Sequence, residues 1–89
     1  GKFMPEISRF FGIFITLNFN DHNPPHFHAK YSEFNGLFDI QTGEMIEGDL
    51  PKTAKKLVRT WAVMHRVELM ENWNLVKNGQ TPINITPLE

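Results

Sequence analysis

Apolar and polar residues alternate near the N-terminus, which indicates a β-strand. Between residues 11 and 19 every odd position is apolar: Phe11, Ile13, Ile15, Leu17 and Phe19. A period of two places successive side chains on opposite faces of an extended segment. The strand is expected to end before Pro24 and Pro25, because proline donates no amide hydrogen and restricts the residue before it. Residues 20–25 are therefore predicted to form a stiff loop.

A second strand is predicted to begin near His26. Its residues divide into an apolar face and a polar face: Phe27, Ala29 and Tyr31 on one side, and His26, His28 and Lys30 on the other. Segments 36–41 and 45–47 then flank Thr42-Gly43, which suits a tight turn in which glycine supplies a positive φ. The pattern predicts a hairpin there, and a sheet of three or four antiparallel strands in total.

The second half of the chain is predicted to be helical from about residue 51 to residue 78. Asp49 can cap the helix, Pro51 is tolerated in its first turn, and Gly79 suits its end. The first part is amphipathic, with an apolar face made by Ala54, Leu57, Val58, Trp61 and His65. The opposite face carries a basic stripe, defined as Lys52, Lys55, Lys56, Arg59 and Arg66.

Apolar residues continue past the amphipathic part, but in new rows: Val63, Val67 and Met70, and then Leu69, Trp73 and Val76. One straight helix would leave several of these side chains uncovered. Either the helix bends or breaks near residues 64–66, or a partner covers the extra face. Segment 81–86 alternates apolar and polar residues after a proline and is predicted to add a short edge strand.

These elements predict an α+β fold, a small antiparallel sheet packed against a long or broken C-terminal helix. A chain of 89 residues supports one core, so residues 4–89 are interpreted as a single domain and residues 1–3 as a remnant of cloning. The absence of cysteine excludes disulfides and thiolate metal sites. No apolar run is long enough to span a membrane and no leader is recognised, so a cytoplasmic protein without membrane association is expected.

The formal net charge of −1 argues against a generic nucleic-acid binder. Charges are nevertheless separated along the chain, because residues 39–49 are acidic and the basic stripe follows. The stripe and Lys30 are the candidates for contacts with RNA phosphates. A basic face opposite an apolar one is more often only solvated, and an acidic partner protein is a further alternative.

Three of the four histidines lie close together, spaced H-x3-H-x-H: His22, His26 and His28. Two of them, two positions apart in a strand, would point to one side, and the Pro-Pro segment would return His22 toward them. Three neutral imidazoles can bind one divalent ion such as Zn, Ni, Cu or Fe and leave a position open for a water. Asp21, Glu33 or Asp39 would complete such a site or orient a ligand.

Two other interpretations of the histidines remain open. Metal-free acid–base catalysis by His22, His26, His28 and Asp21 suits cleavage of RNA, with Lys30 or Arg9 stabilising a phosphate. Alternatively the imidazoles are only hydrogen-bonded loop residues, with Asp21 fixing a tautomer. The remaining histidine, His65, lies on the apolar helix face and is more typical of a hydrogen-bonded core residue.

The segment 21–29, Asp-His-Asn-Pro-Pro-His-Phe-His-Ala, resembles a motif, D-H-x-P-P-H-F-H-A, of a family of small bacterial proteins of unknown function. Segment 4–13, Trp61-Ala62, His65-Arg66, Glu68-Leu69 and Asn72-Trp73 share the resemblance. It implies a gene beside a second small uncharacterised domain, a layout similar to toxin–antitoxin pairs, and no activity. The family typically has an acidic residue after the His-Arg pair, where this chain has Val67. The shared polar positions are Asp21, His22, His26, His28, His65 and Arg66.

Three functional hypotheses follow from the sequence, and none of them decides whether the protein is an enzyme. The leading one is a toxin–antitoxin-like component that binds or cleaves RNA through the histidine loop. The second is a non-catalytic module that binds a partner protein, or a second copy of itself, through the C-terminal helix. The third is a divalent-metal site belonging to a hydrolase or a metal sensor.

Overall fold

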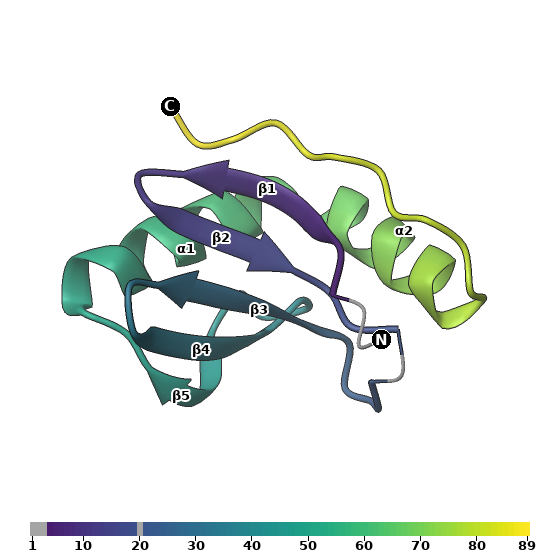
Figure 1. The fold of residues 1–89 in the computed structure, drawn as a ribbon, viewed down its shortest axis with the longest axis horizontal. Coiled ribbons are helices and arrows are strands. Elements are labelled where there is room, and N and C mark those ends of the chain that lie inside the picture. Colours follow the sequence, from purple (N-terminus) through teal and green to yellow (C-terminus); the bar gives the residue numbers. More distant parts are fainter. Residues whose placement is uncertain (1–3, 20) are drawn as a thin grey trace.

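The computed structural model describes residues 4–19 and 21–89, which form an antiparallel sheet and two helices. Its five strands are β1 (Glu6–Phe10), β2 (Ile13–Thr16), β3 (His26–Tyr31), β4 (Phe34–Asp39) and β5 (Met45–Asp49). They pair in the order of the sequence. The helices are α1 (Lys52–Met64), which lies behind the sheet in Figure 1, and α2 (Arg66–Lys77), which lies beside one end of it. The α+β class is confirmed, but the described chain has five strands rather than three or four, and two C-terminal helices.

The alternating segment 11–19 is not one strand. Phe11 and Gly12 form a two-residue turn between β1 and β2, with φ of 50° and 79°, and a turn with two positive φ values follows the twist of a hairpin. The Phe11 side chain is 59% exposed there, so its predicted place in the strand is wrong. The next odd positions are buried as the pattern predicts: Ile13, Ile15 and Leu17.

The predicted hairpin around Thr42-Gly43 joins β4 to β5. The Asp39 carboxylate accepts hydrogen bonds from the backbone N–H groups of Gln41 at 2.7 Å and Thr42 at 3.1 Å. Gly43 has a φ of 79°, which confirms the conformation expected for the glycine. This turn is ordered by a side chain, so its position could be predicted from the local sequence.

The helical segment breaks at His65, within the predicted region. His65 has φ −117° and ψ 28° and separates α1 from α2. Its ring lies 5.5 Å from that of Trp61, and its Nδ1 is 2.5 Å from Oε1 of Glu68. The break allows α2 to direct its own apolar row into the core, where Leu69, Trp73 and Val76 are buried. Val63, Met64 and Val67 stay exposed, so a partner that covers them remains a prediction.

The start of α1 differs from the sequence prediction. Asp49 is the last residue of β5, where it pairs with Asn35 of β4, and it caps no helix. Pro51 takes the N-cap position of α1 and offers no side-chain hydrogen bond. Asp49, which the local sequence predicted as the cap of the helix, is therefore a paired strand residue instead.

Aromatic rings join the sheet to α1. Phe27 of β3 stacks on Phe38 of β4 with ring centroids 5.3 Å apart, and it meets Trp61 of α1 edge-on at 5.8 Å. Trp61 also lies 5.3 Å from Phe10 of β1. All four rings are almost completely buried, and burial of this much apolar area is the main stabilising contribution in a domain of this size. Within the described residues, no helix has the length and apolar character needed to cross a membrane.

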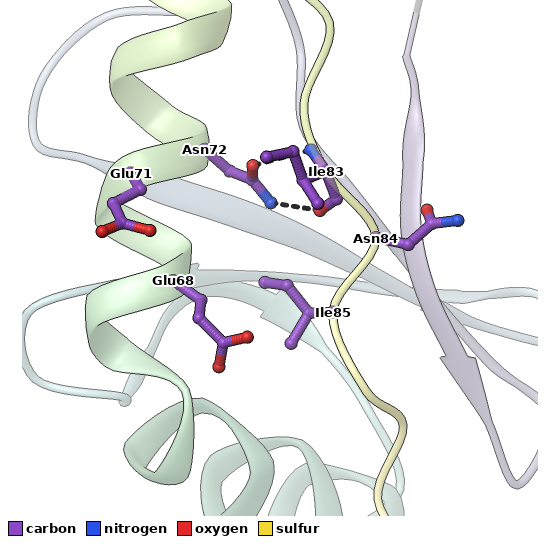
Figure 2. Close-up of a pocket in the computed structure, with 6 residues that line it drawn as sticks. All are labelled: Glu68, Glu71, Asn72, Ile83, Asn84 and Ile85. Atoms are coloured by element: carbon purple, nitrogen blue, oxygen red, sulfur yellow. Dashed lines mark hydrogen bonds between the residues drawn. The ribbon is translucent and has the colours of Figure 1, made fainter.

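The C-terminal segment, residues 80–89, runs alongside β1 and α2 (Figure 1) but is not a strand. One backbone hydrogen bond, from Ile85 N–H to Ile7 O at 2.8 Å, links it to β1. Buried side chains make its other contacts: Ser8 bonds Ile85 O, Trp61 bonds Thr86 O, and Asn72 bonds both backbone groups of Ile83 (Figure 2). The prediction of an edge strand is therefore wrong, because hydrogen bonds from side chains replace most of the backbone hydrogen bonds that such a strand would make with β1.

Replacing Gly48 with alanine is expected to lower the free energy of unfolding by about 2 kcal/mol, measured by urea denaturation. Gly48 has a φ of 97°, and a Cβ there would lie 2.3 Å from the backbone oxygen of Asn35. Gly79→Ala is the matched control, because its φ is 75° but no atom lies within 4 Å of the added carbon. That variant should lose about 1 kcal/mol. Equal losses in the two variants would contradict the predicted backbone clash.

Candidate metal centre

Three potential ligand atoms converge where the loop after β2 meets the start of β3. Oδ2 of Asp21 lies 2.9 Å from Nε2 of His26 and 3.1 Å from Nε2 of His28. All three atoms lie within 4.8 Å of one another. Two imidazole nitrogens and one carboxylate oxygen form a donor set that binds divalent transition metals in proteins.

The strand geometry explains why the two imidazoles meet. His26 and His28 are two residues apart on β3, so their side chains leave the same face, and the ring centroids are 5.3 Å apart. The proline-containing loop is fixed to the end of β4, since Pro25 O accepts a hydrogen bond of 3.0 Å from Ile40 N–H. This attachment holds the loop where Asp21 can face both rings.

His26 is more buried than the sequence indicates. Only 6% of the residue is exposed, and its ring lies 5.3 Å from the ring of Trp73 on α2. The prediction that both histidines face away from apolar side chains is therefore wrong for His26. His28 fits it better, because 28% of its side chain is exposed. The site thus has one buried wall and one side open to solvent.

The hydrogen bonds of His26 fix its protonation pattern. Its Nδ1 lies 2.8 Å from the backbone oxygen of Pro24, which can only accept, so Nδ1 carries a proton. In the neutral ring Nε2 then has a lone pair, and this lone pair faces the lone pairs of the Asp21 carboxylate. Such a contact at 2.9 Å is repulsive unless a proton lies between the two atoms or both atoms bind one metal ion.

The same conflict occurs at His28, where Asn18 takes part. Nε2 of His28 lies 3.2 Å from Nδ2 of Asn18, an amide donor, as well as 3.1 Å from the Asp21 carboxylate. An N–H donor on one side requires a lone pair on Nε2, whereas the carboxylate requires a proton. Asn18 was not among the residues predicted from sequence. Its only signal is its place two residues after β2, whose Thr16 pairs with His28.

The other predicted ligands do not join this group. His22 is exposed and contributes no atom to the cluster formed by Asp21, His26 and His28, so the structure does not bring the expected three histidines together. The Glu33 carboxylate accepts a 2.6 Å hydrogen bond from Ser32 in the turn after β3, which lowers the pKa of Glu33. Asp39 orders the β4–β5 turn. The loop after β2 therefore places an aspartate, and not a third histidine, beside the two histidines of β3.

The predicted basic residues lie in three places. Lys30 is exposed on β3, on the same face as His28, because the two are separated by one residue. The basic stripe is exposed on α1 and at the start of α2, behind the sheet, and its Arg59 is 2.7 Å from Glu44. Arg9 is bonded to Glu6, and this hydrogen bond and the charge of Glu6 raise the pKa of Arg9. Only Lys30 of these shares a strand with the site.

A lysine that the sequence did not single out lies beside the cluster. Lys77, at the end of α2, donates a 3.2 Å hydrogen bond from Nζ to the backbone oxygen of Asp21. Its ammonium group also lies 5.7 Å from the ring of Trp73, which packs on His26. α2 therefore supports the site through both Trp73 and Lys77, a connection between residues distant in sequence.

Comparison with known proteins gives one finding. The model of a family described as a domain of unknown function, DUF4160, matches residues 12–74. The matched range runs from the turn before β2 into α2 and includes Asp21, His26 and His28. No curated protein and no solved structure matches the chain.

Proposed function

We propose that this chain, which belongs to the DUF4160 family of domains of unknown function, binds one divalent transition-metal ion through Asp21, His26 and His28. The observation that carries the proposal is the convergence of two imidazole nitrogens on one carboxylate oxygen, at 2.9 and 3.1 Å. Ligands bound at about 2.1 Å to one metal ion lie about 3.0–3.4 Å from each other. The two measured separations are close to that range.

A metal ion accounts for the contacts better than protons do. Pairing Nε2 of His26 with Asp21 through a proton would make His26, whose Nδ1 already donates to Pro24 O, an imidazolium cation in a position that is only 6% exposed. One divalent ion uses the lone pairs of both rings and the carboxylate charge together.

The donor set and its exposure favour a site of the catalytic type. Three protein ligands leave at least one coordination position for water or substrate, and a metal ion bound there would supply Lewis acidity and an activated water. The side chains of Asp21 and His28 are 23% and 28% exposed. An open, shallow hollow lies beside His28 and is lined also by Asn35, Leu37 and Glu47. Hydrolysis is the reaction class that fits this arrangement.

Titration of chelator-treated, tag-free protein with Zn²⁺ tests the proposal. Isothermal calorimetry should give about one ion per chain in the wild type. His28→Ala should weaken binding at least ~100-fold, since even residues that only orient metal ligands change affinity by about 10–100-fold. His22→Ala is the matched control, an exposed histidine of the same loop, and it should bind like the wild type. If the two variants lose affinity equally, or if the wild type binds no Zn²⁺, the proposal is wrong.

A second candidate function is binding or cleavage of RNA at the same site, as in a toxin–antitoxin-like component. The supporting observation is the pair of lysines near the cluster. Lys30 lies two residues after His28 on the same face of β3, and Nζ of Lys77 lies 3.2 Å from the backbone oxygen of Asp21. Their ammonium groups suit the phosphates on either side of a scissile bond. The basic stripe of α1 contributes less to this candidate because it lies behind the sheet.

Labelled single-stranded RNA, incubated with the protein at low salt with and without Zn²⁺, tests this second candidate. Binding or cleavage should weaken in a Lys30→Ala, Lys77→Ala double variant and persist in a Lys52→Ala, Lys55→Ala control. RNA that stays intact and unbound in every sample excludes the candidate. That result would leave the metal-binding proposal unaffected.

A further inference from the structure

We infer that Asn18 is a fourth ligand of the proposed metal ion, through the oxygen of its side-chain amide. The inference rests on the metal-binding function proposed above. Asn18 is the second residue after β2, and the nitrogen of its amide lies 3.2 Å from Nε2 of His28. The amide thus borders the same space as the ligand atoms of Asp21 and His26.

The amide oxygen of Asn18 is an anomaly in the hydrogen bonding of the fold. Oδ1 is buried and has no hydrogen-bond partner among the described residues. A buried amide oxygen without a donor costs about 1–3 kcal/mol, and such atoms are rare in folded proteins. The amide oxygen of asparagine is also a ligand for divalent metal ions. A metal ion would provide the missing partner.

Rotation of the amide brings its oxygen into the site. A turn of 180° about the last side-chain bond exchanges Oδ1 and Nδ2 and places the oxygen about where Nδ2 now lies. Oδ1 loses no hydrogen bond in this rotation, because it has none among the described residues. Among the described residues, Nδ2 gives up only its contact with Nε2 of His28, whose lone pair a bound metal ion would occupy, and Nδ2 then takes the buried position that Oδ1 leaves.

Three contacts that link the four ligand residues in a row are compatible with one coordination sphere. The contacts of 2.9, 3.1 and 3.2 Å link His26 to Asp21, Asp21 to His28, and His28 to Asn18. They resemble the edges of a polyhedron around an ion with bonds of about 2.1 Å. A set of two nitrogen and two oxygen donors selects Zn²⁺, Co²⁺ or Fe²⁺ over soft ions such as Cu⁺.

Titration with Co²⁺ tests the role of Asn18, because the visible bands of Co²⁺ depend on the number and type of its ligands. Asn18→Ala should lower Co²⁺ affinity at least ~10-fold and shift the visible bands. Asn18→Asp should keep the affinity within about threefold or raise it, since a carboxylate oxygen then takes the place of the amide oxygen. Asn23→Ala, an exposed asparagine of the same loop, should match the wild type in both measurements.

The outcomes distinguish three cases: Asn18 is a metal ligand, Asn18 has only a structural role, or the protein has no metal site. Bands identical in the wild type and Asn18→Ala would overturn the inference even if affinity fell, since the amide would then only position His28. Absence of Co²⁺ binding in the wild type would overturn both the inference and the proposed function. Urea unfolding of each variant checks that it is folded. If Asn18→Ala does not fold, Asn18→Asp carries the test, and shifted visible bands with retained Co²⁺ affinity in that variant support the inference.

Discussion

Zinc at a hundredfold excess over its dissociation constant is expected to raise the melting temperature of the chain by about 10–20 °C. Binding to the native state alone contributes about 2.7 kcal/mol at that concentration. One kcal/mol shifts the melting temperature of a domain this small by about 4–8 °C. His28→Ala should show almost none of this increase, and His22→Ala should show all of it. Thermal unfolding followed by circular dichroism, with and without zinc, measures the effect.

Asp21→Asn gives a sharper test, because it distinguishes a metal site from a site in which a proton joins Asp21 to His26. The two predict opposite changes in the melting temperature of the metal-free protein. An asparagine amide can donate to the Nε2 lone pair of His26, which the Asp21 carboxylate faces at 2.9 Å. If His26 is neutral, Asp21→Asn raises the melting temperature of the metal-free protein at neutral pH and abolishes stabilisation by zinc. A lower melting temperature would show that the carboxylate pairs with an imidazolium, and would favour metal-free acid–base chemistry.

The fold follows the sequence where one residue pattern determines one element. Alternation predicted the buried residues of β2 and the position of β3. The changing apolar rows indicated either a bend or break near residues 64–66 or a partner on the extra face, and the break is found at His65. β1 was missed because Ile7 and Ser8 are both buried. A register shift between Glu6 and Ser8 interrupts the period of two there. A pattern read at a fixed period cannot reveal a strand whose register shifts.

The candidate site was predictable only as far as strand geometry extends. Two histidines separated by one residue must share a face of β3, so their meeting follows from local sequence. The choice of Asp21 over His22 depends on how the proline-containing loop packs against β4. The burial of His26 depends on Trp73, and the participation of Asn18 depends on the pairing of β2 with β3. These are long-range contacts, which no local pattern specifies.

Asn72→Leu is expected to lower the free energy of unfolding by about 3 kcal/mol, because it removes two hydrogen bonds in a buried position. Asn72 is 1% exposed; its Nδ2 donates to Ile83 O at 2.7 Å, and its Oδ1 accepts from Ile83 N–H at 2.8 Å. Figure 2 shows the Asn72 side chain directed at Ile83, while Glu71 points away. The loss of one hydrogen bond that leaves the other group buried without a partner costs about 1–2 kcal/mol. Urea denaturation measures the change.

The same substitution is expected to release the C-terminal segment before the rest of the fold. Asn72 is the only described residue whose side chain bonds both backbone groups of Ile83, so hydrogen exchange at the Ile85 N–H should accelerate more than exchange in β3. Asn74→Ala, an exposed asparagine of the same helix, should leave exchange unchanged and stability within about 0.5 kcal/mol. If Asn72→Leu destabilises β3 and the C-terminal segment equally, that segment is part of the cooperative core and not a separately held element.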